Sequence, residues 1–185
     1  MWKDYIKKTE RRKPLPFVVA SVKRYAPKRG RTLDIGSGAG VEAKFLKKEG
    51  YSVVALDNDA YAIQKLKQRG IKTVKSDIRN FKIKPKTLSI ILCWNILPFL
   101  SKSDGRKVIK RIANGVKKHG IAIISVFGRK DEWRRKITTY SENELKAPFR
   151  GFTFFEWRDV QSISPPVGRK KNKFWHLIQF VAKRR

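Results

Sequence analysis

Cysteine and histidine are scarce in this sequence. Its 185 residues contain one cysteine, Cys93, and two histidines. A disulfide framework needs paired cysteines and a Cys-rich metal site needs several, so both are excluded. We therefore expect no metal site and a reducing compartment, the cytoplasm.

Long apolar runs are also missing. No stretch approaches the roughly 18 apolar residues of a membrane-spanning helix. The first residues, Met1-Trp2-Lys3-Asp4-Tyr5, lack the apolar core of a signal peptide. We expect a soluble protein without a membrane partner, and the 41% of apolar residues suffices for a single domain over residues 1–185.

Acidic residues are few as well. The chain has 15 Asp and Glu against 45 Lys and Arg, which gives a formal charge of +30. Such an excess favours an anionic partner such as nucleic acid. Because basic residues occur in every segment, a generally basic protein surface in the source organism explains the charge about as well as a binding patch does.

Strand-like and helix-like segments alternate along the chain, which predicts a doubly wound α/β sheet. The expected strands are 32–35, 52–56, 72–75, 88–94, 121–126, 152–157 and 174–182. The expected helices include 41–48, 60–68 and one from about Asp104 to Val116, capped by Ser103 or Asp104. The last two strands are joined by a loop alone, so they must either pair antiparallel or lie apart, and the final one, apolar on both faces, should lie inside the sheet.

Three alternate glycines stand in the segment Leu33-Asp34-Ile35-Gly36-Ser37-Gly38-Ala39-Gly40. Glycines between a strand and a helix let the backbone approach a ligand where a Cβ would collide. A dinucleotide site reads G-x-G-x-x-G, whereas the third glycine here comes one residue earlier. The carboxylate of Asp34 beside the loop suits an amino group better than a phosphate.

This segment resembles motif I of the class I S-adenosylmethionine (SAM) methyltransferases. The resemblance implies a Rossmann-like seven-stranded sheet with the last strand antiparallel, methyltransferase activity and SAM as cofactor. Asp57, at the end of the second strand, is placed to accept from the ribose hydroxyls, and Asp77 or its backbone to meet the adenine amino group. The cofactor candidates are Asp34, Gly36, Ser37, Gly38, Gly40, Asp57, Asn58, Asp77, Ile78 and Trp94.

Each acid taken alone is also explained as a loop cap, and dehydrogenases bind ribose in the same way. The glycine pattern together with acids at successive strand ends favours SAM. Asp59 is alternatively only the cap of the helix that follows it.

The chain is similar, over nearly its whole length, to the small tellurite-resistance-type methyltransferases. The similarity rests on Trp2-Lys3-Asp4-Tyr5 with Pro14 to Val18, on Ile96 to Leu100 and on Ser141 to Leu145. It implies that residues 1–26 form an amino-terminal helical segment covering the cofactor site. The sequence departs from that group at Pro98 and over residues 165–170.

The segment Cys93 to Phe99 lies where such folds bind the methyl acceptor. It offers no His, paired carboxylate or nucleophilic thiol, because Cys93 follows Leu92 within a strand and is better explained as a buried hydrophobic residue. No catalytic residue is therefore assigned. The candidate acceptor residues are Trp2, Tyr5, Asn95, Pro98, Phe99, Arg129 and Arg169.

Trp94 and Phe99 either line the adenine or acceptor pocket or simply pack in the core, and the sequence favours neither explanation. His176 is expected to be a core residue with its hydrogen bonds satisfied. The asparagine motif of amino-group methylases fits poorly, because Asn95-Ile96-Leu97-Pro98 lacks its first prolines.

Three functions remain from the sequence. The first is methyl transfer to a small, anionic or thiol-like acceptor, since such an acceptor needs no general base. The second is methylation of RNA or another nucleic acid that docks through the basic surface. The third is a non-catalytic protein that binds SAM or nucleic acid.

Overall fold

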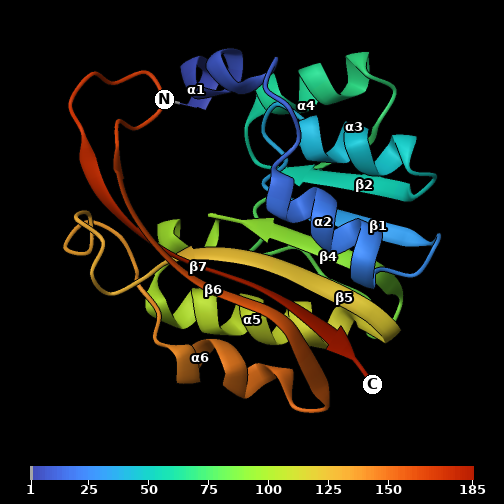
Figure 1. Cartoon of the computed structure of the whole chain (residues 1–185). Helices are drawn as coiled ribbons and strands as arrows, with labels where there is room; N and C mark the ends of the chain where they lie inside the picture. The colour runs from blue at the N-terminus through green and yellow to red at the C-terminus, as the bar shows by residue number, and fades with distance from the viewer. Residues whose placement is uncertain (1) are drawn as a thin grey trace.

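A seven-stranded sheet runs through the centre of the computed structural model, which describes residues 2–185 (Figure 1). The strands are β1 (Arg31–Ile35), β2 (Ser52–Asp57), β3 (Lys72–Lys75), β4 (Leu88–Trp94), β5 (Val116–Phe127), β6 (Phe152–Ser164) and β7 (Lys173–Arg184). Their order is β3-β2-β1-β4-β5-β7-β6, and β7 pairs antiparallel with both of its neighbours. The predicted fold class is confirmed, including the insertion of the final strand inside the sheet.

Helices cover both faces of the sheet. The α-helices are α1 (Trp2–Thr9), α2 (Pro16–Tyr25), α3 (Val41–Lys48), α4 (Ala60–Gln68), α5 (Lys102–Gly115) and α6 (Glu142–Lys146), and the 3-10 helices are η1 (Leu97–Phe99) and η2 (Ala147–Phe149). Side chains of α2, α3 and α4 pack on one face together with Ile90 and Leu92, while α5 packs on the other with Ile91 and Cys93. Strand β4 is therefore buried on both faces, as its apolar run predicts.

Two boundaries differ from the sequence prediction. Helix α5 begins at Lys102, and its cap is Ser101, whose side chain accepts a hydrogen bond from the Asp104 backbone N–H. The strand after it begins at Val116, where we expected the helix to end, and His119 within it has a φ of +62°. Several polar residues in a row offer equivalent caps, so the sequence alone did not separate them.

The last two strands are longer than predicted. The pairing of β5 with β7 ends at Phe127 and Leu177, whereas β6 and β7 remain paired as far as Ser164 and Lys173. Residues 161–176 thus form a two-stranded extension beyond the sheet, here called the arm, which reaches toward α1 (Figure 1). Most of its β6 side is exposed, so the apolar alternation that marks a strand is missing there.

The amino-terminal segment is helical, as predicted, and α1 lies beside the glycine loop. Ile6 of α1 packs with Ala39, Val41 and Ala62. Arg12, just after α1, makes a two-pronged ion pair with Glu42 of α3, at 2.6 and 2.5 Å. That this amino-terminal segment covers the cofactor site stays a prediction.

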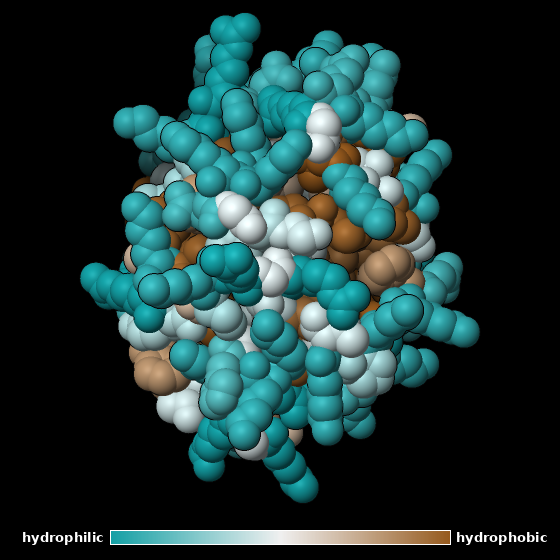
Figure 2. Space-filling view, turned by 90° about the vertical axis from the view of Figure 1, so that its right-hand side faces the viewer, coloured by the Kyte–Doolittle hydropathy of each residue, from teal (hydrophilic) through white to brown (hydrophobic). Residues whose placement is uncertain are grey.

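Hydrophilic side chains project from most of the face shown in Figure 2, and hydrophobic atoms are visible between them near its centre. Among residues 2–185, no helix combines the length and the apolar character that crossing a membrane requires.

Candidate functional site

The three glycines between β1 and α3 serve different purposes. All have positive φ angles, +69° at Gly36, +49° at Gly38 and +72° at Gly40. A Cβ at Gly36 would lie 2.0 Å from Ile96 Cδ1, and one at Gly40 would lie 2.4 Å from Leu66 Cδ2. At Gly38 the nearest such atom is 4.0 Å away. Internal packing therefore requires the outer two glycines, whereas Gly38 borders the space in which a ligand would lie.

Asp57 fastens this loop to the end of β2. Its Oδ2 accepts from the Gly38 backbone N–H at 2.8 Å, and its Oδ1 accepts from the Asp59 N–H at 2.9 Å. Burial raises the pKa of the Asp57 carboxyl, although these backbone hydrogen bonds oppose the shift. Asp59 itself caps α4 by accepting from the Ala62 N–H. The structure thus joins the glycine loop and the Asp57 carboxylate.

Asp34 is a buried carboxyl beside the loop. Its side-chain atom Oδ2 is buried and has no hydrogen-bond partner among residues 2–185. Burial raises its pKa to about 8, and the nearby carboxylates of Glu42 and Asp57 add to the rise. Ser37 is also buried, and its Oγ donates to the Asp34 carbonyl. A buried acceptor without a partner is costly, so this site fits a ligand that brings its own donor, such as an amino group.

The raised pKa of Asp34 makes stability depend on pH. The folded protein holds this proton up to about pH 8, whereas the unfolded chain releases it near pH 3.8. The stability that Asp34 contributes is therefore complete below about pH 4 and is lost as the pH rises toward 8, by on the order of 5 kcal/mol at most. Urea unfolding at pH 5, 6, 7 and 8 should show this loss in the wild type and a flatter profile in Asp34→Asn. Parallel profiles for the two proteins would contradict the assignment.

The residues after β3 are placed differently from those around Asp57. The carboxylate of Asp77 accepts from Arg79 at 2.7 and 3.0 Å, and this hydrogen bonding lowers the pKa of Asp77. Ile78 is 6% exposed and packs in the core beneath α5. Asn58 is exposed. The Ser76 N–H donates to the Asp57 carbonyl, so the backbone near Asp77 is adjacent to the loop even though its carboxylate is engaged elsewhere.

The segment after β4 is held against β5. Asn95 has a φ of +55°, its N–H donates to the Ser125 carbonyl, and its Oδ1 accepts from Ser125 Oγ at 2.7 Å. Pro98 is buried, and Trp94 packs on Phe17 with ring centroids 5.7 Å apart. Phe99, in contrast, is 49% exposed. Of this segment, the phenylalanine is the side chain most available to an acceptor.

Aromatic rings from four parts of the chain form a continuous row that passes through Phe99. Consecutive rings have centroids 5.3 to 6.3 Å apart. We call this set the aromatic row: Tyr5, Trp2, Phe99, Phe127, Trp175 and Trp133. Sequence reasoning found the first three and missed the others, although the place of Phe127 at the carboxyl end of β5 was a usable signal.

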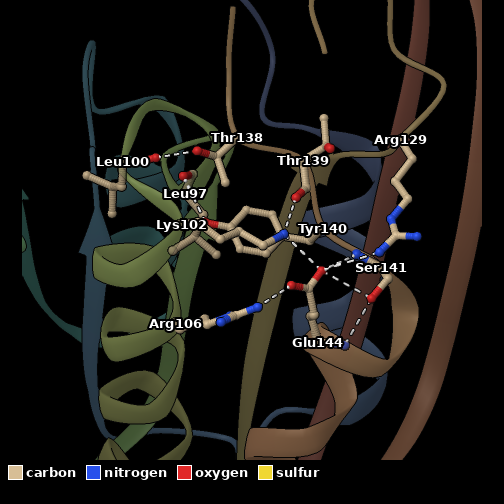
Figure 3. Close-up of polar contacts among 10 residues, drawn as sticks. All are labelled: Leu97, Leu100, Lys102, Arg106, Arg129, Thr138, Thr139, Tyr140, Ser141 and Glu144. Carbon is tan, nitrogen blue, oxygen red and sulfur yellow. Dashed lines mark hydrogen bonds and ion pairs between the residues drawn. The ribbon is translucent and has the colours of Figure 1, made fainter. Parts of the chain in front are cut away.

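Ion pairs around Glu144 fasten the loop after β5 to the segment after β4 (Figure 3). Glu144 contacts Lys102 at 2.9 Å, Arg106 at 3.0 Å and Arg129 at 4.0 Å. Partial burial opposes ionisation, but the hydrogen bonds to Lys102, Ser141 and Arg106 lower the pKa of Glu144 to about 2. Arg129 is thus partly engaged by this carboxylate.

The same loop bonds directly to the segment around Phe99. The Thr138 N–H donates to the Pro98 carbonyl, and Thr138 Oγ1 donates to the Leu100 carbonyl at 2.6 Å. An open pocket of about 450 Å³ lies along this junction. Its lining residues are Pro98, Phe99, Leu100, Ser101, Arg135, Lys136, Ile137 and Thr138.

Arg169 lies on the arm, away from Arg129. The adjacent Gly168 is so close to α1 that a Cβ there would lie 2.3 Å from Lys8 Nζ. The structure therefore places the two predicted arginines on different parts of the rim rather than side by side.

Neither Cys93 nor His176 offers a reactive group at this site. Cys93 is fully buried, and burial raises its pKa to about 12. His176 is buried, its Nδ1 accepts from the Lys130 N–H at 2.9 Å, and its Nε2 lies 2.9 Å from Asp159 Oδ1. The burial of Cys93 is confirmed, and His176 is a core residue as expected, although its Nε2 makes no hydrogen bond within residues 2–185 and only this contact with the Asp159 carboxylate. Within residues 2–185, no group of His, Cys, Asp and Glu is arranged to hold a metal ion.

The geometry agrees with what comparison with known proteins finds. Residues 32–120 match a family model described as a methyltransferase domain. No curated protein matches the sequence at a significant level.

Solved structures share the fold at low sequence identity. TehB from Haemophilus influenzae is 20% identical, and the alignment covers 100% of this chain and 67% of TehB with a TM-score of 0.82. A SAM-dependent methyltransferase from Methanosarcina mazei is 16% identical, with coverage of 94% and 99% and a TM-score of 0.69. A Haloferax volcanii structure holds the Trm112 activator in complex with a methyltransferase described there as putative. Its match is 14% identical, covers 98% of this chain and 94% of that chain, and has a TM-score of 0.73.

Proposed function

We propose that this chain is a class I SAM-dependent methyltransferase with SAM as its cofactor, and that it methylates a small, anionic or thiol-like acceptor bound beside Phe99; the match to a methyltransferase domain over residues 32–120 and the fold shared with TehB support this. One observation carries the proposal. Gly36 of the glycine loop packs directly on Ile96, three residues before Phe99. The loop proposed to hold the cofactor therefore packs against the segment that carries Phe99, which would hold the acceptor.

The residues around Gly38 fit the cofactor by their donors and acceptors. The unpartnered Asp34 carboxyl suits an ammonium group, and the carboxylate of Asp57 keeps lone pairs for ribose hydroxyls beyond its two backbone hydrogen bonds. When bound, SAM supplies a methyl group on a sulfonium, which a nucleophile displaces in line. Four further cofactor contacts remain predictions: Asn58, Asp77, Ile78 and Trp94.

The task of the protein is then to align the acceptor and exclude water. Trp2 and Phe99 provide exposed apolar surface for this, and the buried ring of Phe127 packs against Phe99. The side chains nearby are rings and cations rather than bases, so the acceptor must arrive ionised or soft. Cations on the rim, such as Arg135 and Lys136, favour an anion and lower the pKa of a thiol.

A turnover assay tests the proposal. The purified protein should release S-adenosylhomocysteine from SAM when small thiols or oxyanions are supplied, as measured by mass spectrometry. Phe99→Ala should raise the acceptor KM about tenfold, because it removes the most exposed ring of the mouth. Arg129→Ala and Arg169→Ala should raise it less.

Phe155→Ala is the matched control. Phe155 is 47% exposed but stacks on Tyr25, away from the aromatic row. Its replacement should leave KM unchanged. SAM binding by calorimetry without turnover on any acceptor would instead support the non-catalytic alternative.

A nucleic-acid acceptor is the second candidate. The exposed basic residues on α1, on the loop after β5 and on the arm favour it.

A further inference from the structure

We propose that the rim of this site is a binding surface for single-stranded nucleic acid, in which bases stack on the exposed rings of the aromatic row, Trp2, Tyr5 and Phe99, and phosphates contact the cations beside them. The inference rests on the proposed function only for the position of the mouth near Phe99. It deepens that function by naming the kind of molecule, a single-stranded nucleic acid, that would bring an acceptor group to the mouth.

Exposed hydrophobic side chains gather on this rim. Six large hydrophobic side chains are exposed within residues 2–185, and five of them lie on α1, on η1 or on the arm and its tip. They are Trp2, Tyr5, Phe99, Ile163 and Val167. Single exposed apolar residues are ordinary, but such a concentration marks an interaction site.

Positive charge is concentrated on the same elements. Segments 2–9, 128–138 and 164–173 contain twelve basic residues and three acidic ones. Of the three acids, Asp131 is buried against Lys173, and Glu132 accepts from the Phe174 N–H. The exposed cations are Lys3, Lys7, Lys8, Arg129, Lys130, Arg134, Arg135, Lys136, Arg169, Lys170 and Lys171.

The rings suit a strand whose bases are free. Trp2, Tyr5 and Phe99 are each at least 40% exposed and adjacent to one another. Aromatic side chains bind single strands by stacking on their bases, which a duplex keeps inside the helix. Basic side chains at both ends of the row, on α1 with the neighbouring tip of the arm and on the loop after β5, can then follow the backbone.

The surface is held in place before any ligand binds. Lys173 Nζ lies 2.5 Å from Asp131 Oδ1, and the Asp131 Oδ2 accepts from the His176 N–H. These contacts join the loop after β5 to the base of the arm, and Gly168 at the tip lies against Lys8 of α1. Binding therefore needs little ordering of the protein, which favours affinity.

Lipid is the competing partner, since basic residues with exposed Trp and Tyr also suit a membrane surface. A lipid surface is flat and engages one face. Here the cations stand on three separate elements around a mouth, and hydrophilic side chains also project from the face shown in Figure 2, which is the right-hand side of the molecule in Figure 1. A flexible polyanion can follow such a rim, whereas a plane cannot.

The test measures binding of a fluorescein-labelled 20-nucleotide single-stranded RNA by anisotropy, without SAM, over a series of salt concentrations. We expect sub-micromolar affinity at low salt that falls steeply as salt rises. Replacing Arg169, Lys170 and Lys171 together by Gln should weaken binding at least tenfold and reduce the salt slope by about 2, from roughly 0.7 per lost phosphate contact.

The matched control replaces Lys28, Arg29 and Lys118 by Gln, which removes the same charge at the opposite end of the strands, before β1 and at the start of β5. It should change the affinity less than twofold. Phe99→Ala should weaken binding about tenfold with an unchanged salt slope, because a ring is lost and no cation.

Equal losses in the two triple variants would overturn the proposal in favour of general charge attraction. Equal affinity for a duplex of the same length, or binding to anionic phosphatidylserine vesicles without binding to RNA, would also overturn it. Because no methyl donor is present, these outcomes are independent of the turnover assay. If the protein bound RNA as expected but methylated none of the small acceptors in the turnover assay, only the proposed function would be contradicted.

Discussion

Replacing Gly38 by alanine is expected to weaken SAM binding about 100-fold while the protein stays folded. The added Cβ meets no protein atom closer than 4.0 Å, so the native packing tolerates it. It would, however, project into the space beside the Asp57 carboxylate, to which the Gly38 N–H is bonded. A loss of 100-fold corresponds to about 2.7 kcal/mol, the cost of displacing the ligand or the loop. Isothermal titration calorimetry with SAM measures it.

Gly50→Ala is the control for backbone strain. Gly50 has a φ of +87° and no atom within 4 Å of an added Cβ, so alanine there carries strain of about 1 kcal/mol without a clash. It lies at the end of α3, away from the loop, and its SAM affinity should equal that of the wild type. If Gly38→Ala also bound SAM normally, the glycine loop would not be the cofactor site.

Removing the carboxylate of Asp131 is expected to destabilise the protein by about 3–5 kcal/mol, the cost of leaving a buried charge without its partner. Asp131 is 0% exposed and Lys173 is 2% exposed. The Lys173 ammonium also lies 3.8 Å from the Trp175 ring centroid and 4.7 Å from that of Trp133. Asp131→Ala thus leaves the buried Lys173 ammonium among aromatic rings without its carboxylate partner. Urea denaturation should show the resulting decrease in the free energy of unfolding.

Two further variants separate the ion pair from its surroundings. Asp131→Ala combined with Lys173→Met should cost clearly less than the sum of the single changes, because no buried charge is left. The exposed pair of Glu142 and Lys146 is the comparison, and Glu142→Gln should cost less than about 0.5 kcal/mol. A strictly additive double variant would show that Asp131 and Lys173 do not stabilise each other.

The parts of the site that the sequence predicted are close together in the chain. Asp34 and the glycines occupy seven consecutive positions, and Asp57 ends the next strand, so a parallel sheet must bring them to one edge. Asp77 shows the limit of this reasoning. Its carboxylate is bonded to Arg79, an interaction two residues away that competes with any ligand role.

The rest of the site is assembled from distant residues. Phe127, Trp133 and Trp175 join Phe99 only because β7 is inserted beside β5 and the arm continues past the sheet. The partnership of Asp131 with Lys173 spans 42 residues. No local periodicity marks either feature, and the exposed residues of the arm hide its strand pattern.

By itself, the sequence determined the alternation of strands and helices along the chain and the position of the glycine loop between the first strand and the helix that follows it. Hydrophobic periodicity and glycine spacing are local properties, and each acts through neighbouring residues. Only the tertiary structure decided which aromatic rings meet at the mouth, which charges are buried and which stay free to bind a ligand. Those outcomes depend on contacts between segments far apart in the chain, whose register is set by the packing of the whole sheet.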